Sequence, residues 1–214
     1  MQKVSLTYIT KPSQKDLENR PTVIFLHGRG ADENDLLDLS DYLENDFQFI
    51  SVRAPYTYRY GGYTWFELSE SFEINISQVM KSCNLLFNFL EEIHHKYSID
   101  SKNIFLFGFS MGAMLALNLA IMEPSKFSGV IAHSGLFLDA NNFHYQWNNL
   151  DELHLFIAHG TNDFVVPVDL ARQTYQKLLQ TKAKITYKEY PIGHNISEKS
   201  IEDISIWLHE KITL

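Results

Sequence analysis

The sequence has 214 residues, of which 45% are hydrophobic and 21% charged, a composition typical of a globular protein that forms one domain. Its formal net charge is −8 at pH 7 without a run of Lys or Arg, which argues against a nucleic-acid partner and against electrostatic binding to anionic lipids. No apolar run reaches the roughly 18 residues that a membrane span needs, and the first residues lack the apolar core of a signal peptide, so we expect no integral membrane association.

Short apolar runs alternate with helical patterns along the chain. Five of the runs predict buried parallel strands, at residues 23–26, 47–52, 104–107, 129–132 and 153–158. Residues 185–190 alternate between polar and apolar side chains, as an edge strand does, and residues 5–9 predict another edge strand. Between the strands, apolar residues recur at helical spacing in the segments 36–43, 74–97, 111–122, 169–180 and 197–211.

Strands that alternate with helices are typical of a doubly wound, mostly parallel sheet with helices on both faces, joined by right-handed crossovers. No linker or repeat interrupts the pattern, so residues 1–214 are predicted to form a single α/β domain. Two longer connections, 53–72 and 134–152, are rich in aromatic residues. Long loops often line a functional site, although these aromatic side chains can instead cover the core.

Residues 108–112 read Gly-Phe-Ser-Met-Gly and lie between a predicted strand and a predicted helix. A Gly-x-Ser-x-Gly sequence in this setting is typical of the nucleophile elbow of an α/β-hydrolase. The turn is strained and closely packed, which favours glycine on both sides, and the positive end of the following helix points toward Ser110. Ser110 is therefore the predicted nucleophile.

A serine hydroxyl is a weak nucleophile, so it needs a base, and the base needs an acid that orients it. Asp163 and His194 each come directly after a predicted strand. The chain order Ser, Asp, His is that of α/β-hydrolases, and all three residues follow the carboxyl ends of strands, where open α/β sheets place their chemistry. We therefore expect Ser110, Asp163 and His194 to form a catalytic triad. Asp169 is the rival for the acid, but it lies beyond a proline where a helix starts.

Residues 26–32 read Leu-His-Gly-Arg-Gly-Ala-Asp and follow the first strong strand. The two glycines let the backbone turn so that an N–H faces the nucleophile. The backbone N–H groups of Arg29 and Met111 are the predicted oxyanion hole. The side chain of Arg29 either attracts an anionic group of the substrate or faces solvent.

Cys83 is the only cysteine, so an intramolecular disulfide is excluded, which suits a reducing cytoplasm. Its apolar neighbours predict a buried structural thiol rather than a nucleophile. The nine histidines lack the spacing of a zinc site, and we expect neither a metal nor a cofactor. His27 is expected to stabilise its turn, and His133 and His159, at strand ends, to pack near the site.

With these motifs the chain resembles the phospholipase/carboxylesterase family of α/β-hydrolases, which includes the acyl-protein thioesterases. The resemblance covers nearly the whole chain. It rests on residues 26–32, Arg53-Ala54-Pro55, Trp65-Phe66-Glu67, residues 108–112, residues 159–163 with Val166-Pro167, and Gly193-His194. The resemblance implies a metal-independent serine esterase or thioesterase without a large cap domain, and it assigns the same triad.

Three positions depart from the thioesterase branch of that family. Met111 stands where Gln is usual, Arg29 where Leu is usual, and Glu67 where Asp is usual. Backbone N–H groups do not depend on side-chain identity, so the expected oxyanion hole is kept, whereas substrate preference does not transfer.

The sequence as a whole predicts a cytoplasmic serine hydrolase that cleaves carboxylic esters, or thioesters, of short to medium acyl chains through an acyl-enzyme. Its small-molecule substrate is expected in an open pocket lined by Trp65, Phe66 and Met111, together with Phe137 or Phe164. Two alternatives stay open: an acyl-protein thioesterase or lysophospholipase, and a non-catalytic protein that binds a ligand on a hydrolase scaffold. A homodimer also stays open, because apolar surface patches cannot be recognised in the sequence.

Overall fold

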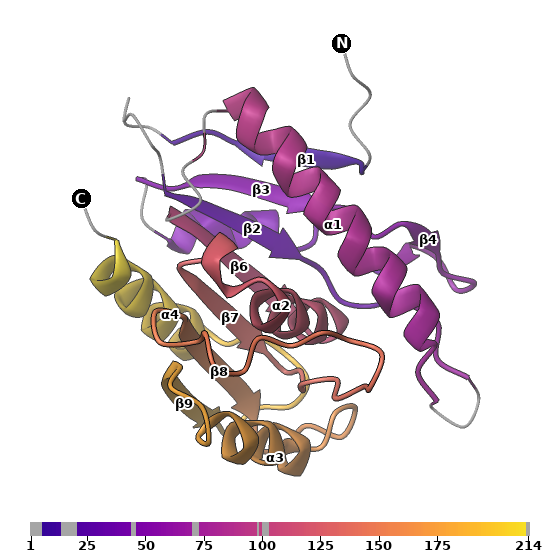
Figure 1. Ribbon diagram of the computed structural model, residues 1–214, viewed down its shortest axis with the longest axis vertical. Helices are drawn as coiled ribbons and strands as arrows, with labels where there is room; N and C mark the ends of the chain where they lie inside the picture. The colour runs from indigo at the N-terminus through magenta and orange to yellow at the C-terminus, as the bar shows by residue number, and fades with distance from the viewer. Residues whose placement is uncertain are drawn as a thin grey trace.

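A seven-stranded sheet runs through the protein, with helices against both of its faces (Figure 1). The computed structural model describes residues 6–13, 21–43, 46–69, 73–97, 99 and 103–212. The strands of the sheet are β1 (Tyr8–Lys11), β2 (Thr22–Leu26), β3 (Gln48–Val52), β6 (Ile104–Phe109), β7 (Gly129–His133), β8 (His154–Gly160) and β9 (Lys184–Tyr190). Their order is β1-β3-β2-β6-β7-β8-β9. Only β1 is antiparallel to its neighbour, which confirms the predicted doubly wound, mostly parallel sheet.

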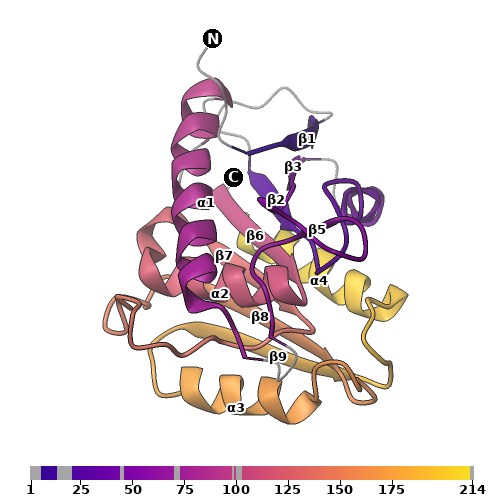
Figure 2. The same cartoon turned by 90° about the vertical axis from the view of Figure 1, so that its right-hand side faces the viewer.

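The helices divide between the two faces of the sheet, as Figure 2 shows with the sheet seen from its side. One face is covered by α1 (Ile76–Tyr97), α2 (Met111–Met122) and α3 (Val168–Leu178). The other face is covered by α4 (Glu198–Lys211) and the short 3-10 helix η1 (Leu37–Tyr42). Another 3-10 turn, η3 (Pro124–Lys126), follows α2, and a small hairpin of β4 (Tyr56–Thr57) and β5 (Tyr63–Thr64) lies outside the sheet.

Two apolar clusters, one on each face, explain why the strands read as continuous hydrophobic runs. Every residue of β2, β3 and β7 is buried, because helices exclude water from both of their faces. Helix α2 is apolar on all sides, and its residues from 111 to 121 are all buried. This helix starts at the residue after the proposed nucleophile, so a fully buried helix supports the candidate site.

Several element boundaries differ slightly from the sequence-based expectation. The segment expected as a helix at 36–43 forms a 3-10 helix, and the N-terminal edge strand starts at Tyr8, with residue 5 outside the described residues. Ser197 caps α4: its hydroxyl accepts from the Ser200 amide at 3.1 Å, and its own amide donates to the Ser200 hydroxyl at 2.9 Å.

The connection 134–152 mainly covers the core. Its aromatic rings pack on one another, with centroids of Phe137 and Tyr145 5.0 Å apart and those of Tyr145 and Trp147 5.2 Å apart. The Tyr145 hydroxyl donates to the Asn118 side chain on α2 at 2.7 Å, which ties the connection to that helix. Packing therefore accounts for most of the aromatic residues in this loop.

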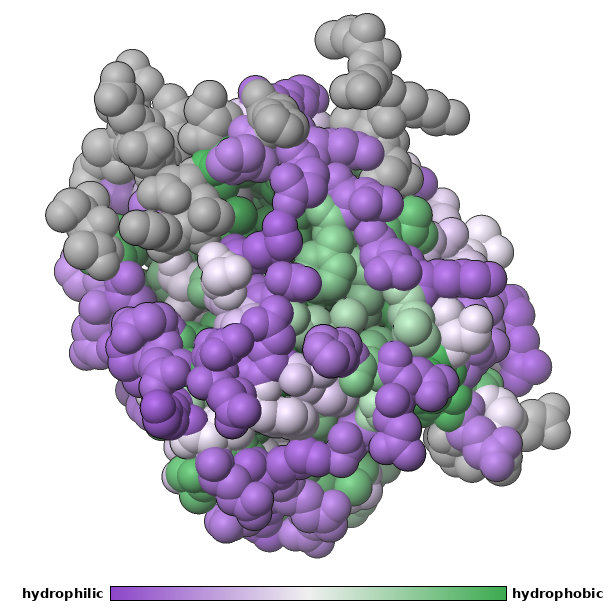
Figure 3. All heavy atoms as spheres, in the orientation of Figure 1, coloured by the Kyte–Doolittle hydropathy of each residue, from purple (hydrophilic) through white to green (hydrophobic). Residues whose placement is uncertain are grey.

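The surface in the view of Figure 3 is mostly hydrophilic, with hydrophobic residues exposed mainly in a band near its middle. Within the described part of the chain, no helix combines the length and apolar character that crossing a bilayer requires.

Candidate active site

Ser110 lies in a sharp turn between β6 and α2. Its backbone has φ 54° and ψ −116°, a strained conformation for a residue with a side chain. A side chain at Gly112 would place its Cβ 1.8 Å from the carbonyl oxygen of Leu26, and one at Gly108 would meet the Gly112 carbonyl carbon at 2.3 Å. Glycine is therefore required at 112 because the end of β2 packs directly against the start of α2, and at 108 because β6 packs against the first turn of the same helix.

The structure brings together Ser110, His194 and Asp163, which come from three separate loops. The Nε2 atom of His194 lies 3.0 Å from Oγ of Ser110, and its Nδ1 atom lies 2.7 Å from Oδ2 of Asp163. Parallel pairing of β6, β7, β8 and β9 makes the loops after β6, β8 and β9 neighbours at one edge of the sheet. A hydroxyl, an imidazole and a carboxylate are thus joined in the order that proton transfer needs.

The carboxylate of Asp163 is fully buried and is held by the backbone as well as by His194. Its Oδ1 atom accepts hydrogen bonds from the amides of Val165 at 2.9 Å and Val166 at 2.8 Å. Burial alone would raise the pKa of Asp163, but the hydrogen bonds from His194 and from these two amides outweigh burial and lower it. The rival acid Asp169 is exposed and pairs with Arg172 at 2.9 Å.

His159 makes a contact that the sequence did not predict in detail. Its Nε2–H donates to the carbonyl oxygen of Val166 at 2.8 Å and lies 3.3 Å from Oδ2 of Asp163. Burial lowers the pKa of His159, so the ring is neutral, and the bond to a carbonyl places the proton on Nε2. Its position at the end of β8, four residues before Asp163, was the only signal in the sequence.

The segment after β2 passes beside Ser110. A Cβ at Gly28 would lie 3.5 Å from Cβ of Ser110. The neighbouring hairpin holds this segment in place, because the Gly30 amide donates to the Tyr63 carbonyl and the Tyr63 amide donates to the Ala31 carbonyl, both at 2.8 Å. The backbone of Arg29 is therefore fixed close to Ser110, where the sequence predicts one half of the oxyanion hole.

Two buried side chains, those of Trp65 and His27, stabilise the turn that follows β2. The Nε1–H of Trp65 donates to the carbonyl oxygen of His27 at 2.9 Å, and the Ala54 amide donates to Nε2 of His27 at 3.0 Å. Burial lowers the pKa of His27, which keeps this ring neutral and able to accept that bond. His27 is thus structural to the turn, as expected.

A cavity of about 240 Å³ opens at Ser110. Apart from Ser110 and Arg29, its described lining is apolar and comprises Phe66, Leu68, Ile74, Met111, Met114, Leu136, Val165, Val166 and Leu170. Of the five side chains predicted to line a pocket, Phe66 and Met111 do so here.

The other three predicted pocket residues lie elsewhere, and this prediction was wrong for this cavity. Trp65 is fully buried beneath the turn after β2. Phe137 packs in the aromatic cluster of the 134–152 connection, and its neighbour Leu136 lines the cavity instead. Phe164 is 94% exposed, while the next two residues, Val165 and Val166, face the cavity.

A third buried histidine, His133, and the single cysteine lie outside this cavity. His133 contacts the hydroxyl of Ser134 at 3.0 Å and that of Ser200 at 3.2 Å, and burial lowers its pKa to about 3. Cys83 is buried in the core, as expected, and burial raises the pKa of its thiol to about 12. Both groups are uncharged at neutral pH.

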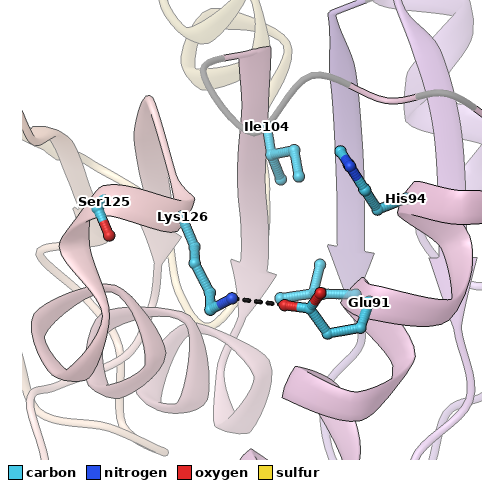
Figure 4. Close-up of a pocket in the computed structure, with 6 residues that line it drawn as sticks. Glu91, His94, Ile104, Ser125 and Lys126 are labelled. Carbon is cyan, nitrogen blue, oxygen red and sulfur yellow. Dashed lines mark hydrogen bonds and ion pairs between the residues drawn. The ribbon is translucent and has the colours of Figure 1, made fainter.

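Another cavity, of about 300 Å³, lies at the amino end of β6, the opposite end of that strand from Ser110 (Figure 4). It contains a serine and a histidine, Ser125 and His94, but Figure 4 shows these on opposite sides, with the ion pair of Lys126 and Glu91 between them. This cavity therefore has no serine positioned against a base.

Known proteins similar to this chain include thioesterases and carboxylesterases, in agreement with the geometry of the candidate site. The chain is 27% identical over 207 residues to acyl-protein thioesterase 1 of Candida albicans, covering 86% of this chain and 89% of that protein. It is 27% identical over 207 residues to lysophospholipase-like protein 1 of Mus musculus, covering 87% and 85%. A Bacillus cereus carboxylesterase structure matches with a TM-score of 0.87 and 23% identity, over 97% of this chain and 95% of that one.

The profile that describes the phospholipase/carboxylesterase family matches residues 9–212. This span includes the three loops that hold Ser110, Asp163 and His194. The fold is that of the α/β-hydrolases. The chain therefore belongs to the phospholipase/carboxylesterase family, and it is a hydrolase of the kind that cleaves ester or thioester bonds.

Proposed function

We propose that this protein is a serine hydrolase in which Ser110, His194 and Asp163 cleave carboxylic esters, or thioesters, through an acyl-enzyme. The observation that carries the proposal is the chain of two contacts, 3.0 Å from the Ser110 hydroxyl to His194 and 2.7 Å from His194 to Asp163. The base thus lies within hydrogen-bond distance of both the nucleophile and the acid that orients it.

In the proposed acylation step, Oγ of Ser110 attacks the carbonyl carbon of the substrate while Nε2 of His194 takes the hydroxyl proton. Negative charge develops on the carbonyl oxygen, where the backbone N–H groups of Arg29 and Met111 would stabilise it. Ionised Asp163 stabilises the imidazolium that forms. The bond to the leaving group then breaks, Nε2 returns its proton to the departing alkoxide or thiolate, and the acyl group stays on Ser110.

Deacylation repeats these steps with water as the nucleophile. His194 takes a proton from the water, the water oxygen attacks the acyl carbon, and the same N–H groups stabilise the second tetrahedral intermediate. Collapse of this intermediate releases the carboxylic acid, and His194 returns the proton to Oγ of Ser110. The free enzyme is thereby restored without a cofactor taking part in either step.

The size and lining of the cavity support short to medium acyl chains. Its volume of about 240 Å³ is below the ~300–1,000 Å³ of ordinary ligand pockets. Apolar side chains supply the wall on which an acyl chain would pack, with Met111 and Met114 on α2 and Leu136 after β7. An acyl-protein thioesterase or lysophospholipase is the second candidate, because this wall would also hold the first part of a long chain.

The deciding experiment is the intact mass of the protein after incubation with a fluorophosphonate. We expect a single adduct on the wild type and none on Ser110→Ala. Ser134→Ala is the matched control, since Ser134 is also buried with a positive φ of 55° and contacts a histidine, and it should keep the adduct. An adduct retained in Ser110→Ala would contradict the assignment, and no adduct on folded wild type would favour the non-catalytic ligand-binding alternative.

Hydrolysis of 4-nitrophenyl esters and matching thioesters from acetate to palmitate separates the two enzymatic candidates. We expect kcat/KM to pass through a maximum at short to medium chains. Rates that keep rising to palmitate would instead favour the thioesterase or lysophospholipase function.

A further inference from the structure

The cavity beside Ser110 contains one charged side chain among its described lining residues. Nine of the eleven are apolar, and the remaining two are Ser110 and Arg29. An arginine in such a wall provides up to five N–H donors in a fixed fork that matches a carboxylate or a phosphate. The cavity thus combines an apolar surface, a nucleophile and one anion-binding group.

The guanidinium of Arg29 is not neutralised by the protein within the part of the chain that the structure describes. No ion pair there involves Arg29, and its one ring contact is with Tyr58, whose centroid lies 5.3 Å from the guanidinium carbon. Arg53 and Arg172 differ in this respect, because Arg53 pairs with Glu33 and Arg172 with Asp169 and Glu189. In a protein of net charge −8, an uncompensated cation beside the nucleophile is a specific attraction for an anion.

The neighbouring hairpin also restricts the position of the Arg29 side chain. The backbone on either side of Arg29 is fixed by the hairpin through the bonds between Gly30, Ala31 and Tyr63, and Tyr58 of the same hairpin supports the guanidinium. Holding the guanidinium against an aromatic face reduces the rotamer entropy that binding an anion would otherwise cost.

We propose that Arg29 is a specificity-determining residue that selects substrates with an anionic group, a carboxylate or phosphate, on the leaving alcohol or thiol. The proposal rests on the function proposed above. Arg29 is exposed and therefore lies on the solvent side of the cavity, and the proposal assigns the leaving group to this side. The acyl chain occupies the apolar wall, where a charged group would lose its hydration without gaining a partner.

The test compares substrates that differ by one charge. 4-Carboxyphenyl butyrate and 4-carbamoylphenyl butyrate carry the same acyl group and have leaving groups of similar shape. Phenyl hydrogen adipate and phenyl adipamate place the same difference on the acyl side. For each pair the measured quantity is the ratio of kcat/KM for the anionic ester to kcat/KM for the neutral ester. A substitution that changes the hydrolysis of both esters equally leaves this ratio unchanged.

The variants are Arg29→Gln and, as the matched control, Arg59→Gln. Arg59 is an exposed arginine of the same hairpin, with its guanidinium 4.7 Å from the Tyr60 ring centroid, and it does not line the cavity. Both substitutions change the net charge of the protein equally. We expect Arg29→Gln to lower the ratio for the butyrate pair about tenfold, equivalent to ~1.4 kcal/mol, and Arg59→Gln to leave it unchanged.

Each other outcome overturns the proposal in a distinct way. An equal fall in both variants would assign the effect to net charge alone, and an unchanged ratio in Arg29→Gln would leave Arg29 without a role in selection. A fall confined to the adipate pair would place the anion on the acyl side. If the wild type hydrolyses none of the esters, the proposed function itself fails, and the inference about Arg29 falls with it.

Discussion

The Nε2 atom of His159 lies 3.3 Å from Oδ2 of Asp163, the same oxygen that His194 contacts at 2.7 Å. Both side chains of the first pair are fully buried. His159 also donates to the carbonyl oxygen of Val166 at 2.8 Å, so it closes the turn that carries the carboxylate. One imidazole faces the nucleophile, and the other holds the acid in position.

Replacing His159 should therefore impair catalysis through Asp163. We expect His159→Phe, which keeps the ring volume but removes the donor, to lower kcat about tenfold or more with little change in KM, because a displaced carboxylate no longer orients His194. His159→Gln, which keeps a donor, should recover part of the loss. A variant that is less stable but has wild-type kcat would show that His159 only supports the fold.

The two candidate acids can be separated by matched substitutions. Asp163→Asn should reduce kcat by about 10⁴-fold, because a neutral amide neither stabilises the imidazolium nor selects its tautomer. Asp169→Asn should stay within twofold of the wild type, since Asp169 is an exposed residue paired with Arg172. Steady-state kinetics on one ester suffices, and a large loss in Asp169→Asn would reverse the assignment.

Buried His133 should make the stability of the protein depend on pH. Folded His133 stays neutral down to a pKa of about 3, whereas the unfolded chain takes up that proton below about pH 6.5. The free energy of unfolding therefore falls as the pH is lowered, by about 2 kcal/mol between pH 7 and pH 5 from this residue.

Urea unfolding of His133→Gln at both pH values measures this contribution. The difference between pH 7 and pH 5 should shrink by about 2 kcal/mol in His133→Gln. An unchanged difference in His133→Gln would mean that the folded protein accepts the proton on His133 near its ordinary pKa.

Filling the cavity should shorten the preferred acyl chain. Leu136→Trp adds volume to a wall of a cavity of about 240 Å³, so kcat/KM for a hexanoate ester should fall at least about tenfold relative to an acetate ester. Phe164→Ala should leave this ratio unchanged, because Phe164 is 94% exposed and does not line the cavity. An altered chain preference in Phe164→Ala would show that acyl chains leave the cavity across that residue.

Much of this site was predictable because its determinants are local. The run from 104 to 107, the glycines at 108 and 112 and the apolar helix after them specify the turn at Ser110 through backbone sterics alone. Asp163 and His194 could be assigned as partners because the carboxyl ends of parallel strands meet at one edge of a sheet. The doubly wound sheet was also predictable from local patterns. The spacing of hydrophobic residues within each segment distinguishes strands from helices, and their alternation along the chain indicates this fold.

The lining of the cavity and the second contact to Asp163 were decided only by the tertiary structure. Trp65 and Phe66 are adjacent, yet one supports the turn after β2 and the other faces the cavity. Phe164 is 94% exposed and does not line the cavity, whereas Val165, itself 65% exposed, and buried Val166 do. In irregular loops the direction of a side chain follows the path of the backbone, and that path is set by long-range contacts such as those of the hairpin with residues 30 and 31. No periodic pattern in the sequence indicates such contacts. The candidate catalytic residues could therefore be predicted from the sequence, whereas the shape of the pocket could not.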